Sequence, residues 1–275
     1  MQPLFQELNQ LMVQYRFRPS RKMAQLFMID SETIKKILAL ADLKQKDVAL
    51  EIGAGTGFLT REIQKHCKVI AVELDDILFM LLEKELPKEN LELVHGDFLK
   101  LNLPRFNKVV SLPPYTIASP IMYRLFELGF EKAVIVFQAE FAERLVAEPG
   151  FFDYNALSVL TQYFCDVKIA GKVSASCFFP SPKSESAIVV LQWKKRREKA
   201  KSTLAFQKFV KSLFRFQNKN LCNALEKSFQ FFSKDLGISR KEFDKRMKKL
   251  SKGDVKVKLM ECDEFVKIFN YFYKK

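Results

Sequence analysis

Short apolar runs alternate with segments of helical spacing over the first two thirds of this 275-residue chain. Each run is five to eight residues long, and a segment between two runs, such as 56–66, has the apolar spacing of a helix. Near-continuous apolar strands separated by helices are typical of a parallel sheet covered on both faces. We therefore predict strands at residues 48–53, 69–74, 91–98, 108–112, 132–138, 167–174 and 186–193. The last two are close enough in sequence to form an antiparallel hairpin at one edge of the sheet.

A basic segment, Lys-Lys-Arg-Arg-Glu-Lys-Ala-Lys at 194–201, ends this alternation. The apolar residues that follow it recur at helical spacing in four successive stretches. We therefore predict two domains, residues 1–195 with the sheet and residues 196–275 with three to five helices.

The net charge of +14 is concentrated in the C-terminal part. Residues 1–193 hold 22 basic and 23 acidic side chains, whereas residues 194–275 hold 24 basic and 9 acidic ones, a net of +15. Clustered Lys and Arg gain affinity for a polyanion by releasing its counterions, so this distribution favours RNA as a partner. The alternative is a solvated, solubilising helical surface.

Composition and cysteine usage exclude several classes of protein. The 48% hydrophobic content is too high for an intrinsically disordered chain, and no apolar run is long enough to span a membrane. The five cysteines are odd in number and far apart, and the N-terminus lacks the plan of a signal peptide. We therefore expect reduced thiols, a cytoplasmic location and a monomer. The two histidines are isolated in the sequence, so we expect no metal site.

A glycine turn follows the first predicted strand, in the sequence Glu51-Ile-Gly53-Ala-Gly55-Thr-Gly57. Glycines are needed where a ligand approaches the backbone closely at a turn with unusual dihedral angles. The spacing G-x-G-x-G is similar to the first motif of S-adenosylmethionine (SAM) methyltransferases. It differs from the G-x-G-x-x-G of dinucleotide-binding proteins, which remain the main alternative.

Two acidic residues end the next two predicted strands. Glu73 is placed to accept hydrogen bonds from ribose hydroxyls, and Asp97 lies where an adenine amino group is expected. Ligands bind at the carboxyl ends of the strands in an open parallel sheet. The glycine turn and the two acids together predict a SAM site, whereas each alone is a weak signal.

The fourth strand runs into Ser111-Leu112-Pro113-Pro114-Tyr115. Amino-group methyltransferases hold their target with a polar residue followed by Pro-Pro-Tyr or x-Pro-Tyr at this place. A side-chain oxygen and a proline carbonyl accept the two N–H groups, and the aromatic ring stacks on the base, so catalysis is mostly positioning. A base in structured RNA must first be unstacked to reach such a pocket.

Several separated motifs resemble, in order, those of the small-subunit ribosomal RNA adenine dimethyltransferase family. Besides the glycine turn, Glu73 and Asp97, these are Lys22–Asp30, similar to K-x-G-Q-x-F-L-x-D; Tyr115–Pro120, similar to the stretch after N-L-P-Y; Gln138, Glu140 and Arg144, similar to Q-x-E-x-x-x-R; Phe179–Lys183, taken as F-x-P-x-P-K; and Lys219–Leu225, similar to K-x-L-x-N-x-L. The resemblance covers nearly the whole chain.

The resemblance implies an α/β fold: a Rossmann-like SAM-dependent methyltransferase domain, with a mostly parallel seven-stranded sheet, and a small all-helical C-terminal domain. It implies methyl transfer to N6 of two adjacent adenosines near the 3′ end of small-subunit rRNA, within an immature small ribosomal subunit.

The resemblance also implies two groups of site residues, and the positive charge of the tail gives a third. The expected cofactor residues are Gln25, Leu26, Met28, Glu51, Gly53, Gly55, Glu73 and Asp97. The expected target-base residues are Leu112, Pro113, Pro114, Tyr115 and Phe179, with Tyr115 and Phe179 on either side of the adenine. The expected RNA-binding residues of the basic tail are Lys194, Lys195, Arg196, Arg197, Arg215, Lys219, Arg246, Lys248 and Lys249.

One departure from the family pattern falls on the chemistry itself. Leu112 stands at the position of the catalytic asparagine, and leucine has no acceptor for the adenine amino group. Ser111 could substitute only if a local bulge turned it, because in a regular strand it points to the opposite face. Ala24 replaces a family glycine, Asn155-Ala156-Leu157-Ser158 stands where G-R-L-S is usual, and Gln217 replaces a common arginine.

Two functions therefore stay open at the level of sequence. The first is an active rRNA adenine N6-methyltransferase. The second is a ribosome-assembly factor of the same fold that binds SAM and pre-small-subunit rRNA without dimethylating it. An N-methyltransferase acting on another nucleic acid is a weaker third option.

Overall fold

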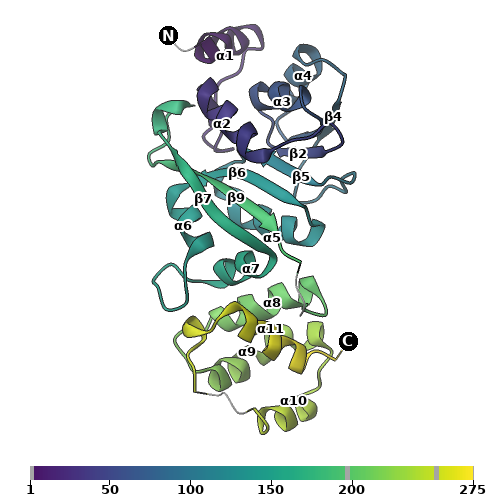
Figure 1. The fold of residues 1–275 in the computed structure, drawn as a ribbon, viewed down its shortest axis with the longest axis vertical. Coiled ribbons are helices and arrows are strands. Elements are labelled where there is room, and N and C mark those ends of the chain that lie inside the picture. Colours follow the sequence, from purple (N-terminus) through teal and green to yellow (C-terminus); the bar gives the residue numbers. More distant parts are fainter. Residues whose placement is uncertain (1–2, 196–198, 251–253, 275) are drawn as a thin grey trace. The chain divides into compact units, whose positions relative to one another are not determined.

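The computed structural model describes residues 3–195, 199–250 and 254–274 (Figure 1). By the density of contacts, these residues form two compact units. The first holds the described residues up to 142 together with 167–193, and the second holds 143–166 together with the described part of 194–275. The domain boundary expected after residue 195 stays a prediction, and nothing in the sequence signalled that 143–166 groups with the C-terminal helices.

A seven-stranded sheet is the centre of the first unit (Figure 1), with the strand order β4-β3-β2-β5-β6-β9-β7. The strands are β2 (Val48–Ile52), β3 (Lys68–Glu73), β4 (Leu91–His95), β5 (Lys108–Ser111), β6 (Lys132–Gln138), β7 (Cys165–Val173) and β9 (Ser186–Trp193). The pairs β4–β3, β3–β2, β2–β5 and β5–β6 are parallel, and β9 is antiparallel to β6. The predicted mostly parallel sheet is confirmed, and β7 lies beside β9 at the edge, as the predicted hairpin requires.

Both faces of this sheet are covered. Each residue from Val69 to Val72 is at most 2% exposed, and each from Ala133 to Phe137 is fully buried. Successive side chains of a strand point to opposite faces, so this burial requires packing on both sides. The helices that follow or precede these strands are α2 (Ser31–Ala41), α3 (Phe58–Gln64), α4 (Asp76–Glu85), α5 (Ala118–Leu128) and α6 (Ala139–Val146). Helix α2 packs on β5 and β6, α3 on β3, and α4 on β3 and β4.

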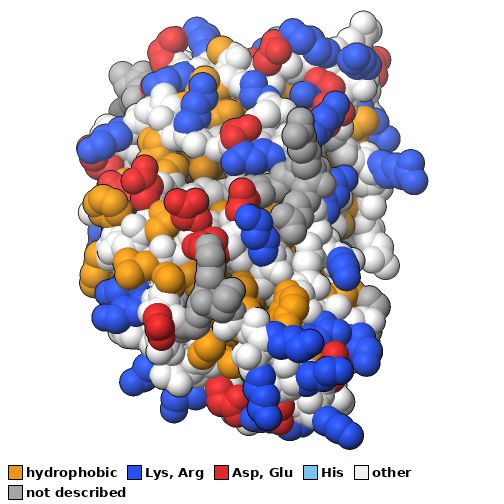
Figure 2. Space-filling view, turned by 60° about the horizontal axis from the view of Figure 1, so that its bottom comes forward, with side chains coloured by type: hydrophobic (Ala, Val, Ile, Leu, Met, Phe, Trp, Pro, Cys, Tyr) orange, Lys and Arg blue, Asp and Glu red, His pale blue; other side chains and the backbone are white. Residues whose placement is uncertain are grey.

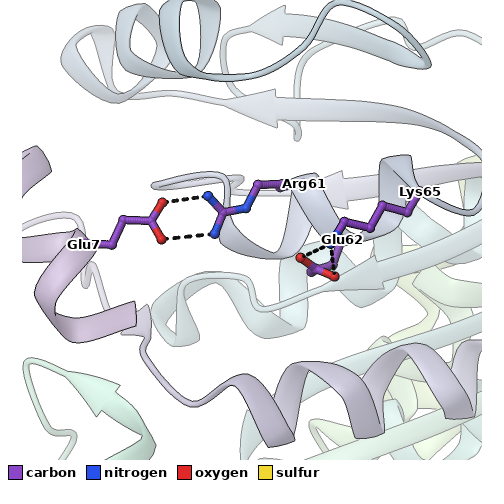
Figure 3. A network of polar contacts seen from close by, with 4 residues as sticks. All are labelled: Glu7, Arg61, Glu62 and Lys65. Atoms are coloured by element: carbon purple, nitrogen blue, oxygen red, sulfur yellow. Dashed lines mark hydrogen bonds and ion pairs between the residues drawn. The ribbon is translucent and has the colours of Figure 1, made fainter. Parts of the chain in front are cut away.

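The N-terminal segment is tied to the sheet domain at two places. Helix α1 (Pro3–Gln14) is joined to α3 by a two-bond ion pair between Glu7 and Arg61, with N–O distances of 2.6 and 3.1 Å, as Figure 3 shows. Strand β1 (Phe27–Met28) pairs antiparallel with β8 (Phe178–Phe179) in a separate two-stranded sheet. This second pairing joins β1, which follows the basic arm, to residues at least 150 positions later in the sequence.

The second unit is helical, as predicted for the C-terminal part. Its described helices are α7 (Ala156–Phe164), α8 (Thr203–Phe214), α9 (Leu221–Leu236), α10 (Arg240–Met247) and α11 (Cys262–Phe272), with the short 3-10 turn η3 (Val257–Leu259). Ser202, Asn220 and Ser239 cap the N-termini of α8, α9 and α10 through their side-chain oxygens. The core is built from fully buried phenylalanines, Phe206, Phe209, Phe232, Phe243, Phe265, Phe269 and Phe272. Many of the chain's 27 phenylalanines are therefore explained by packing.

The expectations about membranes and thiols can be compared with this structure. Among the described residues, no helix combines the length and the apolar character that crossing a bilayer would require. All five cysteines are free thiols. Burial raises the pKa of the Cys67 thiol to about 11, which makes that thiol a poor nucleophile.

Candidate active site

A cavity of about 300 Å³ opens at the carboxyl ends of the parallel strands of the first unit. Its walls come from the residues after β2, β3, β4 and β5, from the segment 22–27 and from Phe178. The expected site residues that line it are Gln25, Leu26, Gly53, Gly55, Glu73, Asp97, Leu112, Pro113, Pro114 and Tyr115. Ligands of open parallel sheets bind at this edge, and the volume is in the range of small-molecule sites. The fold thus brings together ten of the thirteen expected cofactor and target-base residues.

The glycine turn between β2 and α3 cannot accept side chains. Gly53, Gly55 and Gly57 have φ angles of 75, 60 and 79°, in the region that favours glycine. A Cβ at Gly53 would lie 3.3 Å from the Pro114 ring, and one at Gly57 would lie 2.8 Å from a Leu82 methyl group. The turn therefore keeps bare backbone on the cavity at Gly53 and Gly55, and it packs tightly on α4 at Gly57.

Glu73 ends β3 with its carboxylate held by three backbone N–H groups. Oε1 accepts from Leu74 and Asp75 at 2.8 and 2.9 Å, and Oε2 accepts from Gly55 at 2.8 Å. Burial raises the pKa of Glu73, while these three hydrogen bonds oppose the rise. Because a carboxylate offers about four acceptor positions, one remains on Oε2 for a ligand hydroxyl.

Asp97 ends the segment after β4 and lines the same cavity. Its Oδ1 accepts a hydrogen bond of 3.0 Å from the Leu99 N–H, and its Oδ2 lies 3.5 Å from the Lys100 ammonium. The carboxylate retains acceptor positions on both oxygens, so it can receive an exocyclic amino group.

The segment 20–25 is held against the start of α4 by Gln25. The Gln25 Nε2 donates to Asp75 Oδ2 at 3.1 Å, and its Oε1 accepts from the Ser20 N–H at 2.8 Å. Asp75 is itself the N-cap of α4. Gln25 therefore holds the segment over the cavity through Asp75, which lies two residues after Glu73.

Ala24, in this segment, has a left-handed backbone, with φ of 50°. A left-handed backbone costs an alanine about 1–2 kcal/mol of strain. A glycine adopts it without strain but loses more conformational entropy on folding, worth about 0.5–1 kcal/mol. We therefore expect Ala24→Gly to raise the free energy of unfolding by about 0.5–1 kcal/mol in urea titrations. Ala39→Gly, on the exposed face of α2, should instead lower it by about 1 kcal/mol. A loss of stability in Ala24→Gly would contradict the strain.

Two expected cofactor residues, Glu51 and Met28, lie behind the cavity wall. Met28 is 6% exposed and Glu51 is 2% exposed, and neither lines the cavity. Burial raises the pKa of Glu51 to about 8, with the Thr60 hydroxyl opposing the rise and the Glu73 charge adding to it. Glu51 Oε2 is buried without a hydrogen-bond partner. Both residues support the wall from behind, and any contact of theirs with a cofactor stays a prediction.

The end of β5 turns Ser111 and Leu112 to opposite sides. Ser111 is fully buried, and its Oγ donates to the Ile52 carbonyl at 2.8 Å and accepts from the Ile52 N–H at 3.2 Å. Leu112 lines the cavity and packs on the core. The bulge that would turn Ser111 inward is absent from this part of the described chain. The cavity therefore has an apolar side chain at the position where the resemblance predicts an asparagine.

Tyr115 is anchored through its hydroxyl group. Its Oη shares a hydrogen bond of 2.6 Å with the Oγ of Ser186, the fully buried first residue of β9. Burial raises the pKa of Tyr115 to about 12, so the phenol stays neutral at physiological pH. Ser186 was not predicted from the sequence, because no local pattern links positions 71 residues apart. Its contact fixes the ring that faces the cavity.

Phe178, rather than Phe179, contributes to the cavity wall. Phe179 lies in the alternate orientation of β8, where it pairs with Phe27 and packs against the Phe5 ring at 5.3 Å between centroids. Because two phenylalanines are adjacent, the F-x-P-x-P-K spacing is in fact met by Phe178, with Pro180 and Pro182 following. We therefore correct the expected aromatic residue from Phe179 to Phe178.

Some of the expected RNA-binding side chains of the second unit are already bonded within the protein, and others are exposed. Lys194 pairs with Asp166 at 3.1 Å and donates to the Gln162 carbonyl at 3.1 Å. Arg246 donates to Glu242 at 2.9 Å and to the Tyr271 carbonyl. The exposed ones are Lys195, Arg215, Lys219, Lys248 and Lys249, and Arg196 and Arg197 lie outside the described residues. Figure 2 shows Lys and Arg side chains gathered toward the lower edge of the face that it displays. Binding of RNA by any of these residues stays a prediction.

Comparison with known proteins settles the family. The pattern of ribosomal RNA adenine dimethylases matches residues 16–272. The chain belongs to this family. A probable ribosomal RNA small subunit methyltransferase A from Pyrococcus furiosus is 38% identical over 268 residues, covering 92% of this chain and 94% of the relative. The relative with the same name in Methanothermobacter thermautotrophicus is 38% identical, covering 87% and 86%.

Solved structures agree with this family. A dimethyladenosine transferase from Plasmodium falciparum aligns with a TM-score of 0.75 and 26% identity, covering 90% of this chain and 97% of that one. The 23S rRNA methyltransferase ErmE aligns with a TM-score of 0.63 and 26% identity, covering 90% and 100%. The SAM-methyltransferase fold predicted from the sequence is therefore confirmed.

The rRNA adenine dimethylase family uses SAM, and the residues present here fit this cofactor. Gly53 and Gly55 leave bare backbone on the cavity: both have positive φ angles, and a Cβ at Gly53 would also crowd the Pro114 ring. Glu73 keeps an acceptor position toward the cavity, and Asp97 adds a second carboxylate at the next strand end. The chain is therefore a SAM-dependent methyltransferase of the family, and Leu112 lies in the wall of its cavity.

Proposed function

We propose that this chain transfers methyl groups from SAM to N6 of two adjacent adenosines near the 3′ end of small-subunit rRNA, within an immature small subunit in the cytoplasm. The observation that carries the proposal is the single cavity in which a bare glycine turn, two carboxylates and an anchored tyrosine ring meet. The names of the archaeal relatives support the small subunit as the source of the RNA.

The cofactor half of the site uses the turn and the acids. Glu73 accepts hydrogen bonds from the ribose, Asp97 accepts from the adenine amino group, and the backbone at Gly53 and Gly55 lets the ligand approach closely. Gln25 and Leu26 cover it from the segment before β1. SAM supplies an electrophilic methyl group on a sulfonium, and the protein supplies position.

The target half of the site uses the residues after β5 and the loop before β9. Tyr115, held by Ser186, stacks on one face of the adenine, and Phe178 contributes the opposite wall. A proline carbonyl of the Pro113–Pro114 pair accepts one amino N–H. The base has to be unstacked from the RNA to enter, as in other enzymes that modify bases.

The second amino N–H has no side-chain acceptor, because Leu112 is apolar and Ser111 is bonded to Ile52. Loss of one positioned polar group in a catalytic site typically costs about 10²–10³ in rate. This observation favours a second candidate function, a ribosome-assembly factor that binds SAM and small-subunit RNA but methylates slowly or not at all. The two candidates share the cofactor site and the partner and differ only in the chemical step.

The test is mass spectrometry of small-subunit rRNA from cells that contain this chain and from cells in which its gene is deleted. We expect N6-methylated adenosines near the 3′ end in the first and their loss in the second. If the adenosines are unmodified in both and the purified protein still binds SAM in calorimetry, the enzyme function is wrong and the assembly-factor function is supported. Unmodified adenosines without SAM binding would overturn both candidates.

A further inference from the structure

An arginine of the second unit lies stacked on an exposed aromatic ring. The guanidinium carbon of Arg215, the residue that ends α8, is 4.2 Å from the centroid of the Phe231 ring on α9. Phe231 is 40% exposed, in contrast to the fully buried phenylalanines of this unit. A guanidinium at this distance is attracted to the ring and is held in a defined orientation. The pair therefore presents an ordered, planar, cationic surface to solvent.

Unpaired lysines surround this pair. Lys227, Phe231 and Lys234 are spaced four and three residues apart on α9, so they share one face of the helix. The Lys227 ammonium lies 6.0 Å from the centroid of the Phe216 ring, which directly follows Arg215. Lys219 follows one turn later and is exposed.

The acidic side chains of α9 are already used elsewhere. Glu226 is paired with Arg240, and Asp235 is paired with Lys208 at 2.8 Å. Within the described residues, no ion pair involves Arg215, Lys219, Lys227 or Lys234. The exposed face of α9 therefore keeps its positive charge uncompensated, although its helix contains carboxylates.

We propose that this surface, formed by Arg215, Phe216, Lys219, Lys227, Phe231 and Lys234, binds an unpaired stretch of RNA. The outer face of the Arg215 guanidinium and the exposed part of the Phe231 ring take a stacked base, because Phe231 is 40% exposed and, among the described residues, no further ring contact involves either side chain. The three lysines contact the flanking phosphates. In a duplex the base faces are covered by neighbouring bases, so a duplex would bind only through the positive charges of the surface. The Arg215–Phe231 pair therefore favours single-stranded over double-stranded RNA. The inference deepens the proposed function and rests on it, since it assumes that the partner is rRNA.

The test measures the affinity of the full chain for two labelled RNAs by fluorescence anisotropy, a single strand of about 12 nucleotides and a duplex of the same sequence. Phe231→Ala should weaken single-strand binding about 5- to 50-fold and duplex binding less than about twofold, because stacking is lost only in the first. Phe231→Trp should bind the single strand within about twofold of wild type. Arg215→Lys keeps the charge but loses the plane, so it should behave like Phe231→Ala.

A lysine variant separates charge from stacking. Lys227→Gln should weaken binding of both RNAs and lower the slope of log affinity against log salt by about one. Lys241→Gln, an exposed lysine on α10, is the matched control and should change single-strand affinity less than Lys227→Gln does. Equal binding of wild type, Phe231→Ala and Arg215→Lys to the single strand would overturn the proposal. Equal losses for single strand and duplex would also overturn it, because the surface would then act by charge alone.

Failure of this inference and failure of the proposed function give different results. The variants carry unchanged cofactor sites, so SAM affinity measured by calorimetry should equal that of wild type. If small-subunit adenosines are methylated and Phe231→Ala binds RNA as wild type does, the proposed RNA-binding surface is wrong and the methyltransferase function stands. If the adenosines are unmodified and Phe231→Ala selectively loses single-strand binding, the RNA-binding surface is supported and only the methyltransferase function is wrong.

Discussion

Leu112→Asn should raise the rate of methyl transfer to purified immature small subunits by about 10²–10³-fold. Leu112 lines the cavity after β5, and its side chain cannot accept a hydrogen bond. Under the proposed function, one N–H of the target amine is therefore left without an acceptor. An asparagine at this position offers an amide oxygen from the same backbone position, next to the proline carbonyls. The gain should appear in the rate constant of a single turnover with radiolabelled SAM, because the missing contact orients the nitrogen in the transition state.

Leu112→Met is the matched control, since it keeps an apolar side chain of similar volume and adds no oxygen. It should methylate no faster than wild type. Both variants should bind SAM as wild type does, because Leu112 lies on the target side of the cavity. The substitution to asparagine exposes a polar group to a partly apolar wall, so circular dichroism should first confirm that the variant is folded. An asparagine variant no faster than the methionine variant would show that the chemical defect lies elsewhere.

The sheet could be predicted from the sequence to within a few residues at each strand end, because burial on both faces leaves a local signal. β6, for example, was expected at 132–138 and lies at those residues. The pairing of β1 with β8 was not predicted, since each strand is two residues long and its partner is far away in the sequence. Nor was the grouping of 143–166 with the C-terminal helices, which rests on tertiary contacts such as the hydrogen bond from the Tyr154 hydroxyl to the Met260 carbonyl.

The candidate site, like the fold, could be predicted from the sequence only in part. Gly53, Glu73 and Asp97 could be placed together because the carboxyl ends of neighbouring parallel strands share one edge. The opposite orientation of Ser111 and Leu112 also followed from strand geometry. The aromatic residue of the cavity wall was expected at Phe179, whereas Phe178 lines the cavity, because two adjacent phenylalanines make the register of a two-residue strand ambiguous.

Charge was the least predictable property of the site. The basic character of the tail is visible in the sequence, but which cations are free is not. Lys194 is paired with Asp166, 28 positions earlier, whereas Arg215 lies on Phe231 and has no ionic partner among the residues that the structure describes. Asn155, one of the departures expected from the resemblance, caps α7 with its side chain. Gln217, another, contributes only its backbone carbonyl, to the Lys258 N–H, so nothing in the structure explains its side chain.

Glu51→Gln should stabilise the cofactor-free protein at neutral pH and flatten its pH dependence. Burial raises the pKa of Glu51 from 4.5 to about 8, so the folded protein holds a proton that the unfolded chain has released between these two values. Stability linked to this group is therefore greatest below about pH 4.5 and falls as the pH rises toward 8. At about 1.4 kcal/mol per pKa unit, the loss at pH 7 is on the order of 3 kcal/mol. Glutamine has nearly the same shape and no proton to lose, so it avoids this cost.

The measurement is the free energy of unfolding in urea at several pH values, for wild type and for each variant. Glu51→Gln should exceed wild type by on the order of 3 kcal/mol at pH 7 and by less than about 1 kcal/mol at pH 5. Glu89→Gln, which alters an exposed carboxylate, serves as the control and should follow wild type at every pH within about 0.5 kcal/mol. A constant difference between Glu51→Gln and wild type across this range would mean that Glu51 does not change its protonation there. Because the Glu73 charge adds to the rise in the pKa of Glu51, a confirmed pH dependence would also mean that Glu51, behind the cavity wall, is protonated and neutral at pH 7.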